Sequence, residues 1–311
     1  MDFDTLLTTL YATSDDFDKE QLPAEAPQPG PDASLSRAEV ITLAILSQFG
    51  RFVSQKSFYR FAKKHLLGAF PTLPNRSQFN RLMRHHRDAI TAFALHLADL
   101  LDGESSPYQV FDGMGVRVRN AKRRGGGWLE GQANIGHSNR LGWFEGFYVL
   151  IANTAKGTIT GFGFGPASTN DRRMAETFLA KRAEPDPRLV SVGKAAPCPY
   201  IADKGFAGRL WQAHWREEYG AETICVPEKN VTHPWPKELR HWHAGIRQIA
   251  ETVHGKLLEV FRLDRERPHA MDGFQARLAA CVGLHNFCMW LNAQLGRNLL
   301  AFTEIAELIE A

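Results

Sequence analysis

The order of β-rich and helical segments after residue 107 limits the possible folds of this chain more than any other feature. Three short runs of β-branched and aromatic residues come first, and a glycine-containing connection joins two of them as a hairpin. The next two β-rich runs are separated by helical patterns, so they require crossovers and a mixed sheet with helices on both faces. We expect strands over 108–112, 147–152, 158–164, 199–203 and 221–227, and helices over 171–182, 207–219, 244–258 and 274–295.

This order of elements is that of the ribonuclease H-like fold, an α/β fold with a mixed sheet. In that fold the first and fourth strands are neighbours, and here each of them ends on an aspartate, Asp112 or Asp203. A third acid, Glu251, lies inside the expected helix over 244–258. Three carboxylates from two strand ends and one helix could therefore converge at one edge of the sheet.

Carboxylates that come from separate elements suit hard divalent cations. Mg²⁺ prefers oxygen ligands and keeps several waters, which leaves room for a substrate phosphate. A pair of Mg²⁺ ions about 4 Å apart needs such acids to activate water and to stabilise the departing oxygen of a phosphodiester. We therefore expect Asp112, Asp203 and Glu251 to be catalytic and to bind Mg²⁺, for which Mn²⁺ could substitute.

Each acid also has an ordinary structural interpretation. Asp112 could form an Asx turn with the glycine that follows it, and Asp203 could be a turn acid. Glu251 could be the exposed partner of Arg247 in a helical pair worth only ~0.3 kcal/mol. Asp171 is a rival for the second acid, but an expected helix N-cap position gives it a structural use. The joint occurrence of the three acids in the required element order favours the metal site.

The residues before the β-rich region predict a separate, all-α module. Ser36 and Glu39 have the spacing of a capping box at the start of one of its helices. We divide the chain into a helical DNA-binding module, 1–104, and a ribonuclease H-like catalytic domain, 105–311. The expected helices of the module are 1–19, 37–49, 54–67 and 77–101, with a proline-rich linker over 20–33.

The net charge of +3 hides a strong asymmetry. Nine Lys and Arg residues and no Asp or Glu lie between Val40 and Arg87, so the rest of the chain is net acidic. Such segregation points to a polyanionic partner, and we expect the module to bind DNA phosphates through Arg76, Arg81 and Arg84. The alternative is a solvated basic surface on a helical bundle.

A second basic segment follows Asp112 and includes three consecutive glycines at 125–127. A loop so basic and flexible has little reason to pack against the protein. Its position directly after the expected site favours a clamp on a nucleic-acid backbone over a solvated connector. The cationic residues expected to contact DNA here are Arg117, Arg119, Lys122, Arg123 and Arg124.

Composition and cysteine spacing exclude several classes of protein. The chain is 44% hydrophobic and 23% charged, which is typical of a soluble protein. No run reaches the roughly 18 apolar residues needed to span a membrane, and the acidic start is no signal peptide, so we expect a cytoplasmic protein. The four cysteines include no pair at two-residue spacing, which argues against a zinc ribbon or a disulfide framework, and Cys281 and Cys288 are expected core thiols.

Several short motifs occur in order along the chain. They are the strand ending on Asp112, GWFEGFY at 142–148, STNDR at 168–172, ADKGF at 202–206 and RQIAETV at 247–253. Together they resemble the DDE transposases of bacterial insertion sequences, over about residues 40–295. The segments 70–74 and 77–81 are similar to the helical front end of one branch of that family.

The resemblance makes Asp112, Asp203 and Glu251 the metal-binding triad, and it makes Arg247 a contact to DNA near the cleavage point. Two residues of the pattern in many relatives are absent, because Ala244 replaces a tyrosine before that arginine, and a leucine replaces a lysine seven residues after the glutamate.

Histidines between residues 241 and 254 have two candidate roles. His254 shares the helix face of Glu251 and is the better candidate for the polar contact to DNA that the missing lysine would make, since Lys256 lies about 140° around the helix. His241 and His243, together with His254, could suggest zinc. Because the first two would diverge on a helix and no thiolate accompanies them, we favour surface or DNA-facing histidines.

The resemblance therefore implies a DNA transposase of an insertion sequence, an endonuclease that binds its own terminal inverted repeats and target DNA. It would hydrolyse phosphodiesters and then use the freed 3′-hydroxyl for strand transfer at the same two-metal site. The family further implies a homodimer in the synaptic complex, located on the nucleoid, with no membrane partner. Two alternatives stay open, a catalytically silent regulator derived from a transposase, and a nuclease or Holliday-junction resolvase on the same fold.

Overall fold

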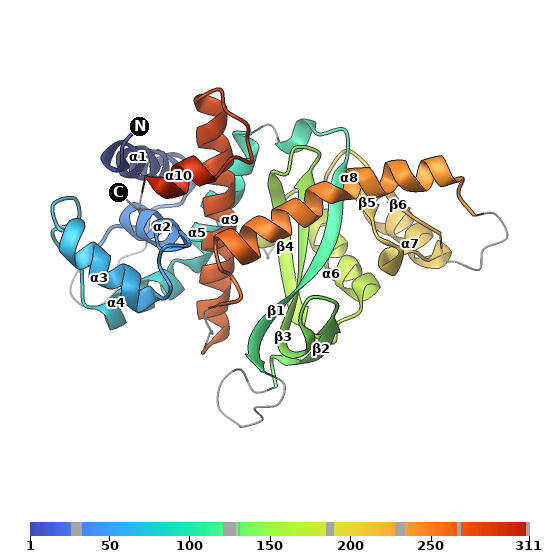
Figure 1. Ribbon diagram of the computed structural model, residues 1–311, viewed down its shortest axis with the longest axis horizontal. Coiled ribbons are helices and arrows are strands. Elements are labelled where there is room, and N and C mark those ends of the chain that lie inside the picture. The colour runs from blue at the N-terminus through green and yellow to red at the C-terminus, as the bar shows by residue number, and fades with distance from the viewer. Residues whose placement is uncertain are drawn as a thin grey trace. The chain divides into compact units, whose positions relative to one another are not determined.

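The structure, a computed structural model, forms two compact units (Figure 1). One unit comprises Met1–Leu97 and Glu259–Ala311, and the other comprises Ala98–Leu258. The C-terminal residues after 258 thus pack with the N-terminal helices, although the sequence division above placed them with the catalytic domain. The structure describes residues 1–25, 33–101, 103–120, 129, 131–184, 190–227, 234–265 and 269–308.

All regular secondary structure among the described residues of the first unit is helical. Its longest helix, α9, is buried on most faces, as its apolar sequence predicted, and it carries the buried thiols of Cys281 and Cys288. A Cβ on Gly283 would lie 3.0 Å from Ile45, so the glycine allows α9 to approach α2 closely. The helices are α1 (Phe3–Gln21), α2 (Arg37–Leu46), α3 (Gln55–His65), α4 (Arg76–His85), α5 (Arg87–Asp99), α9 (Met271–Gln294) and α10 (Thr303–Glu307).

Two expectations about these helices have different outcomes. The capping box is confirmed, because the Ser36 hydroxyl accepts from the Glu39 N–H at 3.2 Å and the Ser36 N–H donates to the Glu39 carboxylate at 2.6 Å. The single helix expected over 77–101 is wrong, because α4 ends at His85 and α5 begins two residues later. The residue between them, His86, is buried, and neither glycine nor proline marks the break. The apolar periodicity continues through His86, so the sequence pattern alone does not predict the break between the two helices.

The second unit contains a six-stranded mixed sheet. Its path is β2-β3-β1-β5-β6, and β4 also pairs with β3. The first three strands of the expected meander pair antiparallel, whereas β5 is parallel to both β1 and β6. The fold class is confirmed as mixed α/β with an all-helical N-terminal region, consistent with a ribonuclease H-like fold. The strands are β1 (Gln109–Asn120), β2 (Asn134–Ser138), β3 (Gly142–Thr154), β4 (Ile159–Pro166), β5 (Tyr200–Ala202) and β6 (Thr223–Cys225).

Helices cover both faces of this sheet. Phe111 packs with Phe178 of α6 (Asp171–Ala183) and with Trp215 of α7 (Arg209–Tyr219) in one buried cluster. Successive strand side chains point to opposite faces, so Asp112 faces the side away from this cluster. On that side α8 (Lys237–Gly255) packs against β1 and β5.

The first strand is longer than the sequence predicted. It continues past Asp112 to Asn120 and pairs with β3 along this whole length, with an irregularity between Arg117 and Arg119. These two arginines therefore lie in a strand, and the expected loop over them is wrong. The Asp-Gly pair looked like a strand end, but Val116 and Val118 continue the buried alternation beyond it.

The last expected helix of the second unit is shifted. It begins at Lys237 instead of about residue 244, and its α-helical part ends at Gly255, before a π-helical turn over Lys256–Val260. Leu258, which stands where many relatives carry lysine, is buried in this turn.

No helix within the described ranges is long and apolar enough to cross a membrane.

Candidate active site

The parallel pairing of β1 with β5 brings two of the predicted acids together. Val110 of β1 pairs with Ile201 of β5, and two residues further on Asp112 lies beside Asp203, which directly follows the strand. The expectation that the first and fourth predicted strands are neighbours is confirmed. Asp112 thus lies just beyond the last residue pair between β1 and β5. At this position its carboxylate can contact other elements.

A single guanidinium from α8 joins the two aspartates. Nη2 of Arg247 donates to Oδ2 of Asp112 at 3.1 Å, and Nη1 lies 3.4 Å from Oδ1 of Asp203. The side chains of Arg247 and Asp112 are only 17% and 16% exposed, whereas that of Asp203 is 43% exposed. Water screens the ion pair between Arg247 and Asp112 less than the pair between Arg247 and Asp203, so the contact with Asp112 is the stronger one.

Both aspartates also make the turn hydrogen bonds that their sequence context allowed. The N–H of Gly113 donates to Oδ1 of Asp112 at 2.9 Å, and the N–H of Lys204 donates to Oδ1 of Asp203 at 2.6 Å. Asp112 can form the turn and belong to the site at the same time, because its Oδ1 accepts from the backbone N–H of Gly113 and its Oδ2 accepts from Arg247.

Glu251 and His254 lie on α8 beyond Arg247. Glu251 is exposed and follows the arginine by one helical turn. Burial lowers the pKa of His254, while the negative charges of Asp112 and Glu251 oppose that shift, so both acids lie within electrostatic range of one imidazole ring. The Nε2 atom of His254 is buried and has no hydrogen-bond partner among the described residues.

A third aspartate, ranked below Asp203 in the sequence analysis, also belongs to this cluster. Asn170 is the N-cap of α6, and its Oδ1 accepts from the N–H of Arg172 at 2.9 Å. The expected capping role of Asp171 is therefore wrong. As the first residue of the helix, Asp171 instead forms a side-chain hydrogen bond with the hydroxyl of Tyr148 on β3.

The charges of the three aspartates influence one another. Burial raises the pKa of Asp171, the negative charges of Asp112 and Asp203 raise it further, and the hydrogen bond from Tyr148 lowers it. Burial also raises the pKa of Tyr148 well above its ordinary value, and the same three carboxylates add to that shift. Asp171 is thus a half-buried acid near Asp112 and Asp203, which already share the guanidinium of Arg247.

Two glycines make room for the pair of Tyr148 and Asp171. A Cβ on Gly113 would lie 1.8 Å from the Tyr148 hydroxyl, and a Cβ on Gly205 would lie 2.0 Å from Oδ2 of Asp171. Each glycine follows one of the predicted acids by one or two positions. The glycines of the Asp-Gly and Asp-Lys-Gly motifs are therefore required for packing, whereas the sequence alone indicated only turns.

The predicted DNA contacts fall in both units. In the second unit, Arg117 is half-buried in β1, and the backbone of Arg119 lies in the same strand. In the first unit, Arg76 and Arg81 are exposed on α4, while Arg84 forms an ion pair with Asp272 at 2.6 Å. Lys122, Arg123 and Arg124 lie outside the described residues, as does half of the predicted linker, 26–32.

The histidines of α8 do not form a common site. His241 is exposed, but His243 is buried, lies 3.4 Å from the carbonyl of Ile224 and packs against the ring of Trp235. The expectation of surface histidines is therefore wrong for His243.

One other group of side chains has the spacing of metal ligands. Within the described ranges, Glu25, His85 and His86 are the set of three whose ligand atoms all lie within 4.8 Å of one another. The acids around Arg247 do not form such a set of three among the described residues.

The mixed sheet is consistent with a ribonuclease H-like domain, and Asp112 and Asp203 lie where two of its parallel strands meet α8. A family model described as a transposase DDE domain matches residues 105–287, which is more than half of the chain. The chain therefore belongs to this family of transposases, and the resemblance seen in its motifs is confirmed. Searches of curated proteins and of solved structures gave no match.

Proposed function

We propose that this protein is the transposase of a bacterial insertion sequence, which binds the terminal inverted repeats of its element and cleaves and joins DNA at the acidic site. The observation that carries the proposal is the double ion pair of Arg247. It draws Asp112 and Asp203 of adjacent segments toward one helix, and that helix presents Glu251 one turn further on.

The three acids have the ligand chemistry that a hard divalent cation requires. All three offer carboxylate oxygens, which Mg²⁺ and Mn²⁺ prefer. Asp112 and Asp203 together create a negative potential, which the guanidinium of Arg247 neutralises here. Asp112, Asp203 and Glu251 would hold the metal, whose chemistry is to activate water and to stabilise the departing oxygen.

In this proposal Arg247 binds a DNA phosphate. Its guanidinium is planar and can form two parallel hydrogen bonds to phosphate oxygens. Both of its Nη atoms face an aspartate, and its buried Nε has no hydrogen-bond partner in the part of the chain described here. Release of the more exposed Asp203 would leave one Nη for the scissile phosphate, while the contact with Asp112 keeps the arginine in the site.

Cleavage and strand transfer are both in-line displacements at phosphorus. In cleavage, a water oxygen forms the new P–O bond as the bond to the 3′-oxygen breaks, which leaves a 3′-hydroxyl and a 5′-phosphate. In transfer, that hydroxyl attacks a target phosphodiester, loses its proton to solvent and expels the 3′-oxygen of the target. One acidic site can serve both steps in turn.

The helical unit supplies DNA binding in this proposal. Its basic segment between Val40 and Arg87 contains no acid, and Arg76 and Arg81 are exposed on α4. Because the two ends of an element must be held together, the active assembly would be a homodimer or larger, bound to the chromosome.

The test compares Asp203→Asn with Asp99→Asn, an exposed aspartate of the same unit, in Mg²⁺-dependent nicking of a plasmid that carries the DNA flanking the gene. We expect Asp203→Asn to abolish nicking without weakening DNA retention, and Asp99→Asn to change neither. Loss of both activities in Asp203→Asn would make the residue structural, and unchanged nicking would sink the proposal.

The same reagents separate the two other functions. A catalytically silent regulator would retain DNA but would not nick it with Mg²⁺. A nuclease or resolvase would nick DNA but would fail to join pre-cut ends to a target. Products in which pre-cut ends are joined to target DNA are expected only from a transposase.

A further inference from the structure

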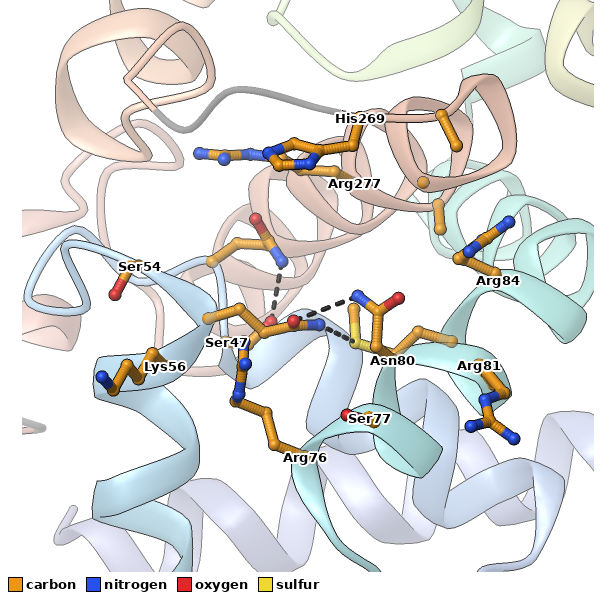
Figure 2. A pocket seen from close by; sticks show the side chains of 16 residues that line it. Ser47, Ser54, Lys56, Arg76, Ser77, Asn80, Arg81, Arg84, His269 and Arg277 are labelled. Atoms are coloured by element: carbon orange, nitrogen blue, oxygen red, sulfur yellow. Dashed lines mark hydrogen bonds between the residues drawn. The ribbon is translucent and has the colours of Figure 1, made fainter. Parts of the chain in front are cut away.

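A basic cavity lies wholly within the first unit, whereas the acidic site belongs to the second. Its volume is about 550 Å³, and it is lined by residues from the start of α3, from α4 and from the start of α9 (Figure 2). Figure 2 shows His269 and Arg277, from the C-terminal part of the chain, across the hollow from Arg76 and Ser77 of α4. His269 and Arg277 lie far beyond residue 104, where the basic module expected from the sequence ends.

The lining is cationic. None of the described residues that line the cavity is acidic, and the acid in the first turn of α9, Asp272, forms an ion pair with Arg84 at 2.6 Å. A cavity wall with this excess of positive charge attracts anions. The Lys and Arg residues of the wall are Lys56, Arg76, Arg81, Arg84 and Arg277.

Amide side chains connect two of the helices at the cavity. Nδ2 of Asn80 on α4 donates to Oε1 of Gln55 on α3 at 3.0 Å, and Nε2 of Gln55 donates to the thioether sulfur of Met83 at 3.5 Å (Figure 2). The first bond fixes α3 against α4. Sulfur is a weak acceptor, so the amide of Gln55 could exchange this partner for a phosphate oxygen.

Three helices begin at this cavity. Ser54 is the N-cap of α3, Arg76 is the first residue of α4, and Ala270 is the N-cap of α9 without a side-chain hydrogen bond. The N–H groups of a first helical turn carry partial positive charge and lack partners within the helix. The side chains of Ser54 and Asn75 already cap α3 and α4, so the uncapped start of α9 is the one that adds most to the side-chain charge in favouring an anion.

The lining chemistry narrows the ligand to a phosphate ester. A metal ion is disfavoured because no described lining residue is acidic, and an apolar ligand is disfavoured by the serine, amide and cationic side chains. Apart from His269, the described lining offers no aromatic ring on which a base could stack. Lys56, Arg76 and Arg81 are exposed at the rim, where a long polyanion can reach them, and Arg84 and Arg277 are half-buried.

We propose that this cavity binds backbone phosphates of double-stranded DNA, and that Arg277 shares the contact with the basic face of α4. The identity of the polyanion rests on the proposed function, whereas the anion site rests on the cavity itself. Arg277 is held for this role by a hydrogen bond from its Nη2 to the carbonyl of Arg262 at 2.8 Å. The DNA-binding surface is then built from both ends of the chain.

The test measures the salt dependence of binding to a fluorescein-labelled DNA duplex by anisotropy. The slope of log K against log salt concentration is negative, and each lost phosphate contact should make this slope shallower by about 0.9. We expect a shallower slope for Arg277→Gln and for Arg76→Gln. The control Arg60→Gln removes an exposed charge of α3 outside the cavity and should leave the slope unchanged.

The outcomes separate the cavity from the proposed function. If wild-type protein binds DNA with strong salt dependence but both cavity variants keep its slope, or Arg60→Gln lowers the slope equally, the cavity assignment is overturned and the proposed function stands. A flat response in wild-type protein overturns both. If inorganic phosphate displaces the duplex completely at low concentration, the cavity takes small anions instead. Should Arg277→Gln fail to fold, the exposed Arg76→Gln decides.

Discussion

The carboxylate of Asp171 fills the space that a side chain at position 205 would need. A Cβ on Gly205 would lie 2.0 Å from Oδ2 of Asp171, and the acid is half-buried and hydrogen-bonded to Tyr148. Glycine at this position therefore determines how closely the turn after Asp203 approaches the start of α6. The acid pair at Arg247 and the Asp171 cluster are connected through this turn.

Substitution of Gly205 should disturb both stability and cleavage. Gly205→Ala must displace Asp171 or the turn, and such overpacking costs about 1–3 kcal/mol of unfolding free energy. Gly245→Ala is the matched control, because no atom outside its own helix lies within 4 Å of the new methyl group, and alanine should stabilise that helix by about 0.5–1 kcal/mol. Urea unfolding and plasmid nicking measure both effects, and equal behaviour of the two variants would contradict the close contact.

Removal of Arg247 should make stability depend on divalent metal. Arg247→Ala leaves Asp112 and Asp203 without their shared cation, at a cost of about 1–3 kcal/mol in the presence of EDTA. Mg²⁺ should restore much of this loss if the acids bind it, whereas Mg²⁺ should have less effect on wild-type protein. Urea unfolding with EDTA and with Mg²⁺ tests this, and an absence of any Mg²⁺ effect in Arg247→Ala would count against the metal site.

Glu251 and Asp171 should differ in their contribution to cleavage. Glu251→Gln removes a proposed metal ligand and should slow nicking on the order of a thousandfold, which corresponds to about 4 kcal/mol. Asp171→Asn can keep the contact with Tyr148 and should slow nicking only about 10-fold. Single-turnover nicking rates at saturating DNA give the comparison. A reversed order would make Asp171 the third acid of the site.

His243 should lower the stability of the protein in acid. Burial lowers the pKa of His243 from its ordinary value of 6.5, against a smaller opposing effect of the hydrogen bond with Ile224. Above that value the ring is neutral in both states. As the pH falls below 6.5, the unfolded chain binds the proton first, so the free energy of unfolding decreases until the folded pKa is reached.

Urea unfolding at a series of pH values between about 7.5 and 5 tests this effect. His243→Phe should lose less stability than wild-type protein over the interval, because its ring cannot bind a proton. His241→Phe, which removes an exposed histidine of the same helix, should follow the wild-type curve. Parallel curves for His243→Phe and wild type would show that His243 titrates normally.

Local sequence patterns identified most elements because each pattern reflects a local physical preference. The capping box at Ser36 and Glu39 fixes a helix start through hydrogen bonds three residues apart, and the apolar pattern of α9 reflects burial on nearly every face. The same reasoning failed at His86, because a helix break without glycine or proline leaves no local sign. The same reasoning predicted an end of β1 at Asp112, which is too early. An aspartate followed by glycine is typical of a turn, but here Gly113 lies within the strand and makes room for Tyr148.

The sequence by itself determined most of the order of elements, though not β2, and it determined the acidic residues and the basic front segment, because hydrophobic periodicity and charge are properties of neighbouring residues. Only the tertiary structure decided that Arg247 joins Asp112 to Asp203, that Asp171 meets Tyr148, and that residues after 258 complete a cavity with α3 and α4. Each of these contacts joins segments far apart in the chain. Their geometry depends on strand register and helix packing, which no local pattern specifies.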